Sequence, residues 1–93
     1  MAVEKECVLK NKYGLHMRPA ERLVSLANGF RSEIRISSGG GEEVSAKSII
    51  SVISLGVGPG EKLTVRCKGR DEAKALKAIA ELIADRFGLG EEK

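Results

Sequence analysis

Along this 93-residue chain the apolar residues switch between two spacings, one typical of strands and one typical of helices. The order of these segments restricts the fold more than any other feature of the sequence. Residues 62–68 place an apolar side chain at every second position, namely Leu63, Val65 and Cys67, which is the pattern of a half-buried β-strand. Residues 20–27 instead repeat apolar side chains at i, i+3, i+4 and i+7, which is the pattern of an amphipathic helix. A short chain that switches between the two periods predicts strands and helices that share one core.

The same two patterns divide the remainder of the chain into elements. We expect strands at residues 3–9, 32–37 and 42–46, a helix at 17–27, a short helix from about Lys47, and a long helix whose apolar stripe runs from Ala73 to Phe87. Gly29 should end the first helix in the left-handed conformation, and Asp71 should cap the start of the last. The order β-α-β-β-α-β-α, with alternating strands, predicts an α+β fold with helices on one face of the sheet and water on the other.

The length and composition fit a single soluble domain over residues 1–93. Hydrophobic residues make up 42% of the chain and charged residues 31%, which is enough apolar material for one core. The net charge of +3 is spread along the chain and lacks the concentration that nucleic-acid binding requires. The three aromatic residues, Tyr13, Phe30 and Phe87, lie outside the predicted strands, which disfavours an RNA-binding sheet. We therefore expect a monomer that binds no nucleic acid.

Neither a membrane segment nor a metal site is indicated by the residue pattern. The longest apolar run, at residues 49–57, is interrupted by polar residues and glycine, and a membrane span needs roughly 18 to 20 apolar residues. Residues 1–6 lack the pattern of a secretory signal, so we expect a cytoplasmic protein without membrane insertion. Cys7 and Cys67 have no metal-ligand spacing, and we expect buried free thiols with no metal or cofactor. Whether the two thiols touch is left open.

The only histidine, His16, lies where a turn leads into the first helix, in the segment Gly-Leu-His-Met-Arg-Pro-Ala at residues 14–20. Proline is favoured in a first helical turn, so Pro19 places His16 at or near the N-cap. The helix dipole and Arg18 favour a neutral, nucleophilic imidazole. The amides of Met17 and Arg18, with the guanidinium, can hold an anion brought to the ring, which suits a phosphoryl acceptor. These residues alone leave open an ordinary polar histidine at a helix start.

Two motifs at a specific separation carry a resemblance to a known family. Residues 14–20, followed at 46–56 by Ala-Lys-Ser-Ile-Ile-Ser-Val-Ile-Ser-Leu-Gly, resemble the histidine-containing phosphocarrier protein (HPr) family of the bacterial phosphotransferase system. The resemblance covers nearly the whole chain and implies an open-faced β-sandwich, with four antiparallel strands and three helices on one face. It implies that His16 accepts a phosphoryl group through Nδ1 from enzyme I, charged by phosphoenolpyruvate, and donates it to an enzyme IIA domain. Arg18 would pair with the phosphate, and the protein would be a carrier without turnover of its own.

The second motif implies a regulatory site and a docking surface. Ser48 matches the serine that an ATP-dependent HPr kinase/phosphorylase modifies in many bacteria, and a phosphate near the start of the short helix would be tolerated by the helix dipole. The short helix holds more apolar residues than one buried face needs, so some of them should be exposed. The residues expected at the partner surface are Met17, Arg18, Lys47, Ile49, Ile50 and Ile53, and those expected in the core are Val52 and Leu55.

Two positions depart from the family pattern, and a second function stays open. Met17 replaces the small residue that is common after the histidine, which enlarges the apolar contact. Tyr13 stands where a small hydrogen-bonding residue is frequent, so the surroundings of the imidazole are not specified. On the same scaffold the chain could be a non-catalytic regulatory binding protein controlled by phosphorylation of Ser48. The sequence also leaves the sugar branch and the nitrogen-related branch of the phosphotransferase system as alternatives.

Overall fold

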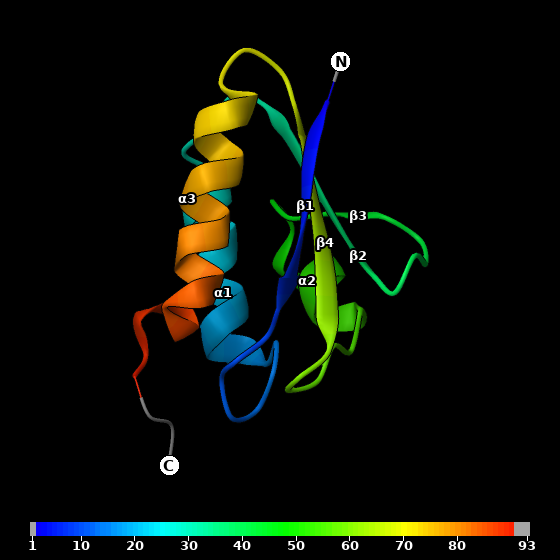
Figure 1. The fold of residues 1–93 in the computed structure, drawn as a ribbon, viewed down its shortest axis with the longest axis vertical. Helices are drawn as coiled ribbons and strands as arrows, with labels where there is room; N and C mark the ends of the chain where they lie inside the picture. Colours follow the sequence, from blue (N-terminus) through cyan, green and yellow to red (C-terminus); the bar gives the residue numbers. More distant parts are fainter. Residues whose placement is uncertain (1, 91–93) are drawn as a thin grey trace.

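The computed structural model describes residues 2–90 and contains a four-stranded sheet with helices on one face (Figure 1). The elements are β1 (Val3–Val8), α1 (Met17–Ala27), β2 (Glu33–Ser38), β3 (Val44–Ser45), α2 (Ile49–Ser54), β4 (Lys62–Lys68), α3 (Glu72–Ala84) and the 3-10 turn η1 (Arg86–Gly88). Their order and the α+β class are those predicted from the hydrophobic periods. Figure 1 shows α1 and α3 side by side against the sheet.

All strand pairs of the sheet are antiparallel, in the order β1-β4-β2-β3. The central position of β4 agrees with its clean alternation, because its inward side chains are fully buried. The register answers the question about the thiols: Val3 lies opposite Cys67, and Cys7 lies opposite Leu63, four positions before Cys67. The two cysteines are therefore separate free thiols. Burial raises the pKa of both, that of Cys67 to about 11, so neither is a ready thiolate at neutral pH.

The predicted end of the last helix was wrong. Helix α3 ends at Ala84, and its buried positions are Ala75, Ile79 and Ile83, whereas Ala73 is exposed. The backbone then turns through positive φ at Arg86 (54°) and Phe87 (58°). This turn returns the Phe87 ring to the core, where it is fully buried. Burial of the aromatic side chain offsets the backbone strain of a left-handed non-glycine residue.

Two predicted helix caps also differ in the structure. Gly29 does not adopt the left-handed conformation; instead the Asn28 amide and the Asn28 side chain each donate to the Val24 carbonyl, both at 2.9 Å. Asp71 does stand at the N-cap of α3, but its carboxylate makes no bond to that helix. It accepts hydrogen bonds from the backbone amides of Arg31 (3.0 Å) and Ser32 (2.9 Å), so it joins α3 to the loop before β2.

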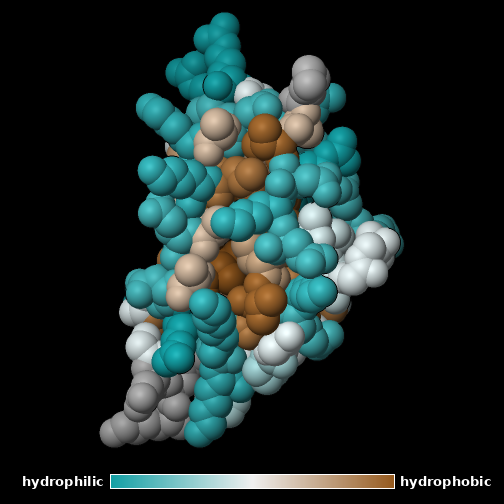
Figure 2. Space-filling model, viewed as in Figure 1, coloured by the Kyte–Doolittle hydropathy of each residue, from teal (hydrophilic) through white to brown (hydrophobic). Residues whose placement is uncertain are grey.

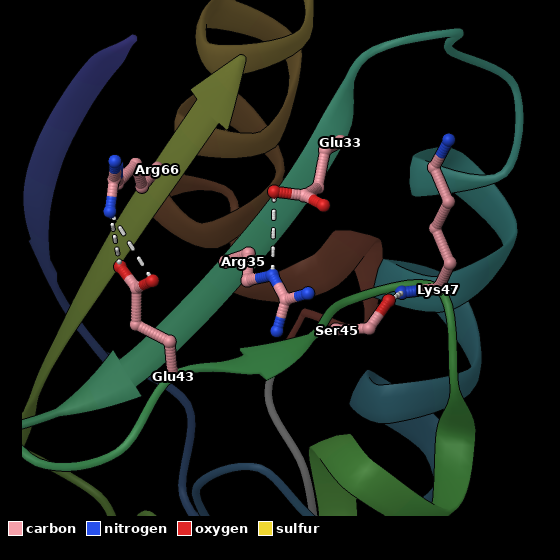
Figure 3. Close-up of polar contacts among 6 residues, drawn as sticks. All are labelled: Glu33, Arg35, Glu43, Ser45, Lys47 and Arg66. Carbon is pink, nitrogen blue, oxygen red and sulfur yellow. Dashed lines mark hydrogen bonds and ion pairs between the residues drawn. The ribbon is translucent and has the colours of Figure 1, made fainter.

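The face of the sheet opposite the helices carries charged side chains (Figure 3). Arg35 and Arg66 lie directly opposite each other on β2 and β4. Each guanidinium has a carboxylate beside it, Glu33 at 3.5 Å from Arg35 and Glu43 at 3.4 Å from Arg66. The carboxylates offset the repulsion between the two adjacent cations and keep this face polar.

An apolar seam follows the open edge of the sandwich between α3 and β1 (Figure 2). A cavity of about 330 Å³ lies there, lined by Val3, Leu76 and Ala80, with Lys5, Lys77 and Glu81 among its other lining residues.

Within residues 2–90, none of the helices combines the length and the apolar character that crossing a bilayer requires.

Candidate functional site

A tightly closed turn precedes the histidine and fixes its position. The buried side chain of Asn11 donates from Nδ2 to the Gly14 carbonyl, and the Gly14 amide donates to the Asn11 carbonyl at 3.4 Å. Gly14 has φ +68°, and a Cβ there would lie 2.5 Å from the Val57 carbonyl oxygen. The buried Leu15 donates its amide to that same carbonyl at 2.9 Å. The loop after α2 therefore holds the chain up to the residue before His16.

His16 is the N-cap of α1, as predicted. Its backbone is extended, with φ −84° and ψ −169°, and its carbonyl accepts the first helical bond from Ala20 at 3.0 Å. Its side chain makes no capping bond to the first turn, and that turn holds no acidic residue. Pro19 is buried and lacks an N–H, so the first-turn amides that follow His16 are those of Met17 and Arg18. The imidazole is partly exposed and can meet an anion in solution.

Tyr13 is the neighbour of the imidazole that the sequence left unspecified. Its ring meets the His16 ring edge to face, with centroids 5.7 Å apart and planes at 85°. The Lys12 ammonium lies 5.3 Å from the centroid of the same tyrosine ring. Tyr13 is 49% exposed. The sequence does contain a pattern that could have indicated this contact: an aromatic residue three positions before the histidine, with a glycine turn between them.

Some residues of the predicted partner surface are exposed, and others are partly buried against the core. Met17 and Ile50 are 53% and 79% exposed, and Arg18 is exposed beside them in sequence. Ile49 and Ile53 are partly buried and pack against the core. Val52 is fully buried, as expected for a core residue, and Leu55 is partly buried against the core.

Lys47 and Ser48 lie where the start of α2 meets the end of α1. The Lys47 ammonium donates to the Phe30 carbonyl at 2.7 Å, and the Asn28 side chain donates to the Lys47 carbonyl at 3.3 Å. Ser48 is the N-cap of α2, partly exposed, and its Oγ accepts the Ser51 amide at 3.4 Å. Because α1 has 11 residues, its two ends are about 16 Å apart. His16 therefore lies at one end of α1, next to Met17 and Arg18 in the chain, and Ser48 follows Lys47 at the other end of that helix.

Fold and site together define a class of protein: a small α+β domain that offers one partly exposed histidine at a helix N-cap, followed in the chain by the exposed Met17 and Arg18. The family described as PTS HPr component phosphorylation site matches residues 3–85. This chain belongs to the HPr family and is a phosphocarrier of the phosphotransferase system. HPr is a carrier and not a catalytic enzyme.

Individual relatives agree with that assignment. Phosphocarrier protein HPr of Cupriavidus necator is 40% identical over 89 residues, which cover 96% of this chain and 99% of the relative. The crystal structure of HPr-C-His from Thermoanaerobacter tengcongensis superimposes with a TM-score of 0.89 at 41% identity, covering 98% of this chain and 99% of that one. A multiphosphoryl transfer protein of Vibrio cholerae is 44% identical over 85 residues, which cover 89% of this chain and 21% of that larger protein.

Proposed function

We propose that His16 accepts a phosphoryl group from enzyme I, which phosphoenolpyruvate has charged, and donates it to an enzyme IIA domain of a sugar or nitrogen-related phosphotransferase system. The observation that carries this proposal is the position of His16 as the partly exposed N-cap of α1, directly before the amides of Met17 and Arg18. The buried Pro19 and Ala20 hold the helix start, so the His16 backbone and the amide donors keep a constant relation.

The chemistry follows from an imidazole at a helix start that offers hydrogen-bond donors. The lone pair of one ring nitrogen, Nδ1 in the family, forms a bond to phosphorus while the bond from phosphorus to the donor's leaving atom breaks, and the other ring nitrogen keeps its proton. The amides of Met17 and Arg18 and the Arg18 guanidinium receive the phosphoryl oxygens. Each helix-end interaction stabilises the charge by only ~0.3 to 1 kcal/mol, and up to ~2 kcal/mol when partly buried. The phosphoryl group is therefore held without being trapped and can be passed on.

The partners would dock on apolar residues at the start of α1 and on α2. Met17 and Ile50 are the most exposed of these apolar residues, Ile49 and Ile53 contribute their exposed edges, and Arg18 supplies a cation. An apolar centre with a charged rim is the usual composition of a transient protein interface. The Lys47 ammonium already donates to the Phe30 carbonyl, so it would be less available than Arg18 to pair with a carboxylate of the partner.

We also propose that an HPr kinase/phosphorylase modifies Ser48. A phosphoserine would add roughly −1.5 to −2 charges at the start of α2, two positions before the exposed Ile50. Like-charge repulsion would then weaken docking of an acidic or phosphorylated partner, without any contact to the distant imidazole.

The test is phosphorylation of the wild-type chain and of matched variants by enzyme I with labelled phosphoenolpyruvate. The wild type and Ser48→Ala should each gain one acid-labile phosphoryl group, and His16→Ala should gain none. A label that survives in His16→Ala would refute the assignment. Labelling of Ser48 by ATP and the kinase, with none at His16 from enzyme I, would favour the regulatory binding protein instead.

A further inference from the structure

We propose that Tyr13 is a positioning residue for the imidazole of His16, and that the aromatic ring performs this role without the hydroxyl. The inference rests on the proposed function of His16. The two rings meet at a centroid distance of 5.7 Å and an interplanar angle of 85°. This edge-to-face arrangement is one that aromatic pairs prefer, because the positive edge of one ring meets the negative face of the other.

The turn that carries Tyr13 is held in place, so the contact follows from the backbone. Gly14 reverses the chain at φ +68° and lies against the Val57 carbonyl, where no Cβ would fit. The two hydrogen bonds between Asn11 and Gly14 close the turn on the other side. Tyr13 and His16 are thus attached to one constrained segment, and their side chains lie on the same side of it.

Burial in the core does not explain where the Tyr13 ring lies. The residue is 49% exposed and is not part of the buried cluster. The Lys12 ammonium lies 5.3 Å from the centroid of this ring, and the centroid of the imidazole lies 5.7 Å from it. A cation near the ring is attracted to its electron-rich face and helps to fix the ring orientation.

The Tyr13 contact bears on the reaction because the last torsion of a histidine side chain is soft. Rotation about the Cβ–Cγ bond of histidine is broad, so a fixed N-cap backbone does not by itself decide which nitrogen faces the amides of Met17 and Arg18. An edge-to-face contact changes the population of one ring orientation by about twofold to tenfold. Reaction at one nitrogen accelerates by a similar factor when that orientation is the reactive one.

The experiment uses two phosphoryl donors and two substitutions of one residue. Phosphoramidate is a small donor that needs no protein surface: its N–P bond breaks, ammonia leaves, and the imidazole nitrogen takes the phosphoryl group. With phosphoramidate, we expect Tyr13→Phe to react within about twofold of the wild type and Tyr13→Leu to react about threefold to tenfold more slowly. Tyr13→Leu keeps apolar bulk but has no ring, and amide spectra establish that both variants are folded.

A spectroscopic readout separates positioning from a general structural effect. The carbon-bound imidazole protons of His16 should show a ring-current shift in the wild type and Tyr13→Phe, and this shift should disappear in Tyr13→Leu. The proposal is overturned if Tyr13→Leu reacts with phosphoramidate as fast as the wild type. It is also overturned if the rate loss occurs with enzyme I but not with phosphoramidate, because Tyr13 would then be a docking contact. A wild-type chain that accepts phosphate from neither donor would refute the proposed function, while the spectra would still decide the ring contact.

Discussion

The carboxylate of Asp71 accepts hydrogen bonds from both the backbone amide and the hydroxyl of Ser32, a residue 39 positions earlier in the chain. A third bond comes from the Arg31 amide at 3.0 Å. The Ser32 hydroxyl bond, followed by the bond from the Arg31 amide, lowers the pKa of Asp71 from 3.8 to about 2. The start of α3 is thereby attached to the loop that leads from α1 into β2.

The Asp71 contact predicts a specific dependence of stability on pH. Because the pKa of this carboxyl is lower in the folded state, its contribution to the free energy of unfolding is present above about pH 4 and is lost as the pH falls toward 2. Asp71→Asn should lower stability at pH 7 and should show a smaller decrease between pH 4 and pH 2. Urea unfolding at several pH values measures this, with the exposed Asp85→Asn as control. Equal pH profiles for the wild type and Asp71→Asn would contradict the prediction.

Gly14→Ala should destabilise the fold by about 2 kcal/mol or more, because the new Cβ combines a left-handed backbone with a 2.5 Å contact to the Val57 carbonyl. Gly40 separates these two effects. It has φ +79°, but a Cβ at this position would meet no atom within 4 Å, so Gly40→Ala should cost only about 1 kcal/mol. Chemical denaturation compares the two variants. Similar losses for both would show that the packing of Gly14 against Val57 is unimportant.

Two neighbours in α2 should separate stability from docking. Val52 is fully buried, so Val52→Ala should reduce the free energy of unfolding by about 2 kcal/mol. Ile50 is 79% exposed, so Ile50→Ala should change it by less than about 0.5 kcal/mol and should instead weaken binding to enzyme I. Thermal unfolding and titration calorimetry measure the two quantities. Unchanged affinity in Ile50→Ala would remove this residue from the partner surface.

Lys47 should contribute to stability through its bond to the Phe30 carbonyl. Lys47→Met removes this 2.7 Å bond and should cost about 1 kcal/mol, because the donor is charged and partly buried. Lys62→Met is the matched control, since the exposed Lys62 lies 3.6 Å from Glu6 and such surface pairs contribute roughly 0 to 1 kcal/mol. If Lys62→Met lowers the free energy of unfolding as much as Lys47→Met does, the bond to the Phe30 carbonyl contributes no more than an exposed ion pair.

Local patterns predicted the elements wherever local forces decide the structure. The alternation over residues 62–68 predicted β4 with its observed bounds, and Pro19 predicted that His16 would stand at the N-cap of α1. The end of α3 could not be predicted in this way, because Phe87 continues the apolar stripe of the helix. Only the three-dimensional core shows that a reversed backbone at Phe87 buries the ring.

Several contacts made by the singled-out residues could not be predicted from the sequence. The capping rule correctly predicted Asp71 at the N-cap of α3, but it predicted a bond to the helix that is not made. The carboxylate instead accepts from Ser32, which is distant in sequence. The contact between Tyr13 and His16 depends on a turn that the remote Val57 holds in place. The division of the isoleucines of α2 into exposed and partly buried positions depends on how α1 packs against that helix.

The most direct test of the central claim is phosphorus NMR of the chain after reaction with enzyme I and phosphoenolpyruvate, followed by addition of an enzyme IIA domain. A single phosphohistidine resonance assigned to His16 should appear and should then vanish as the IIA domain becomes phosphorylated. A resonance that never forms at His16, or one that forms and does not transfer, would contradict the account of this imidazole as a reversible phosphoryl carrier.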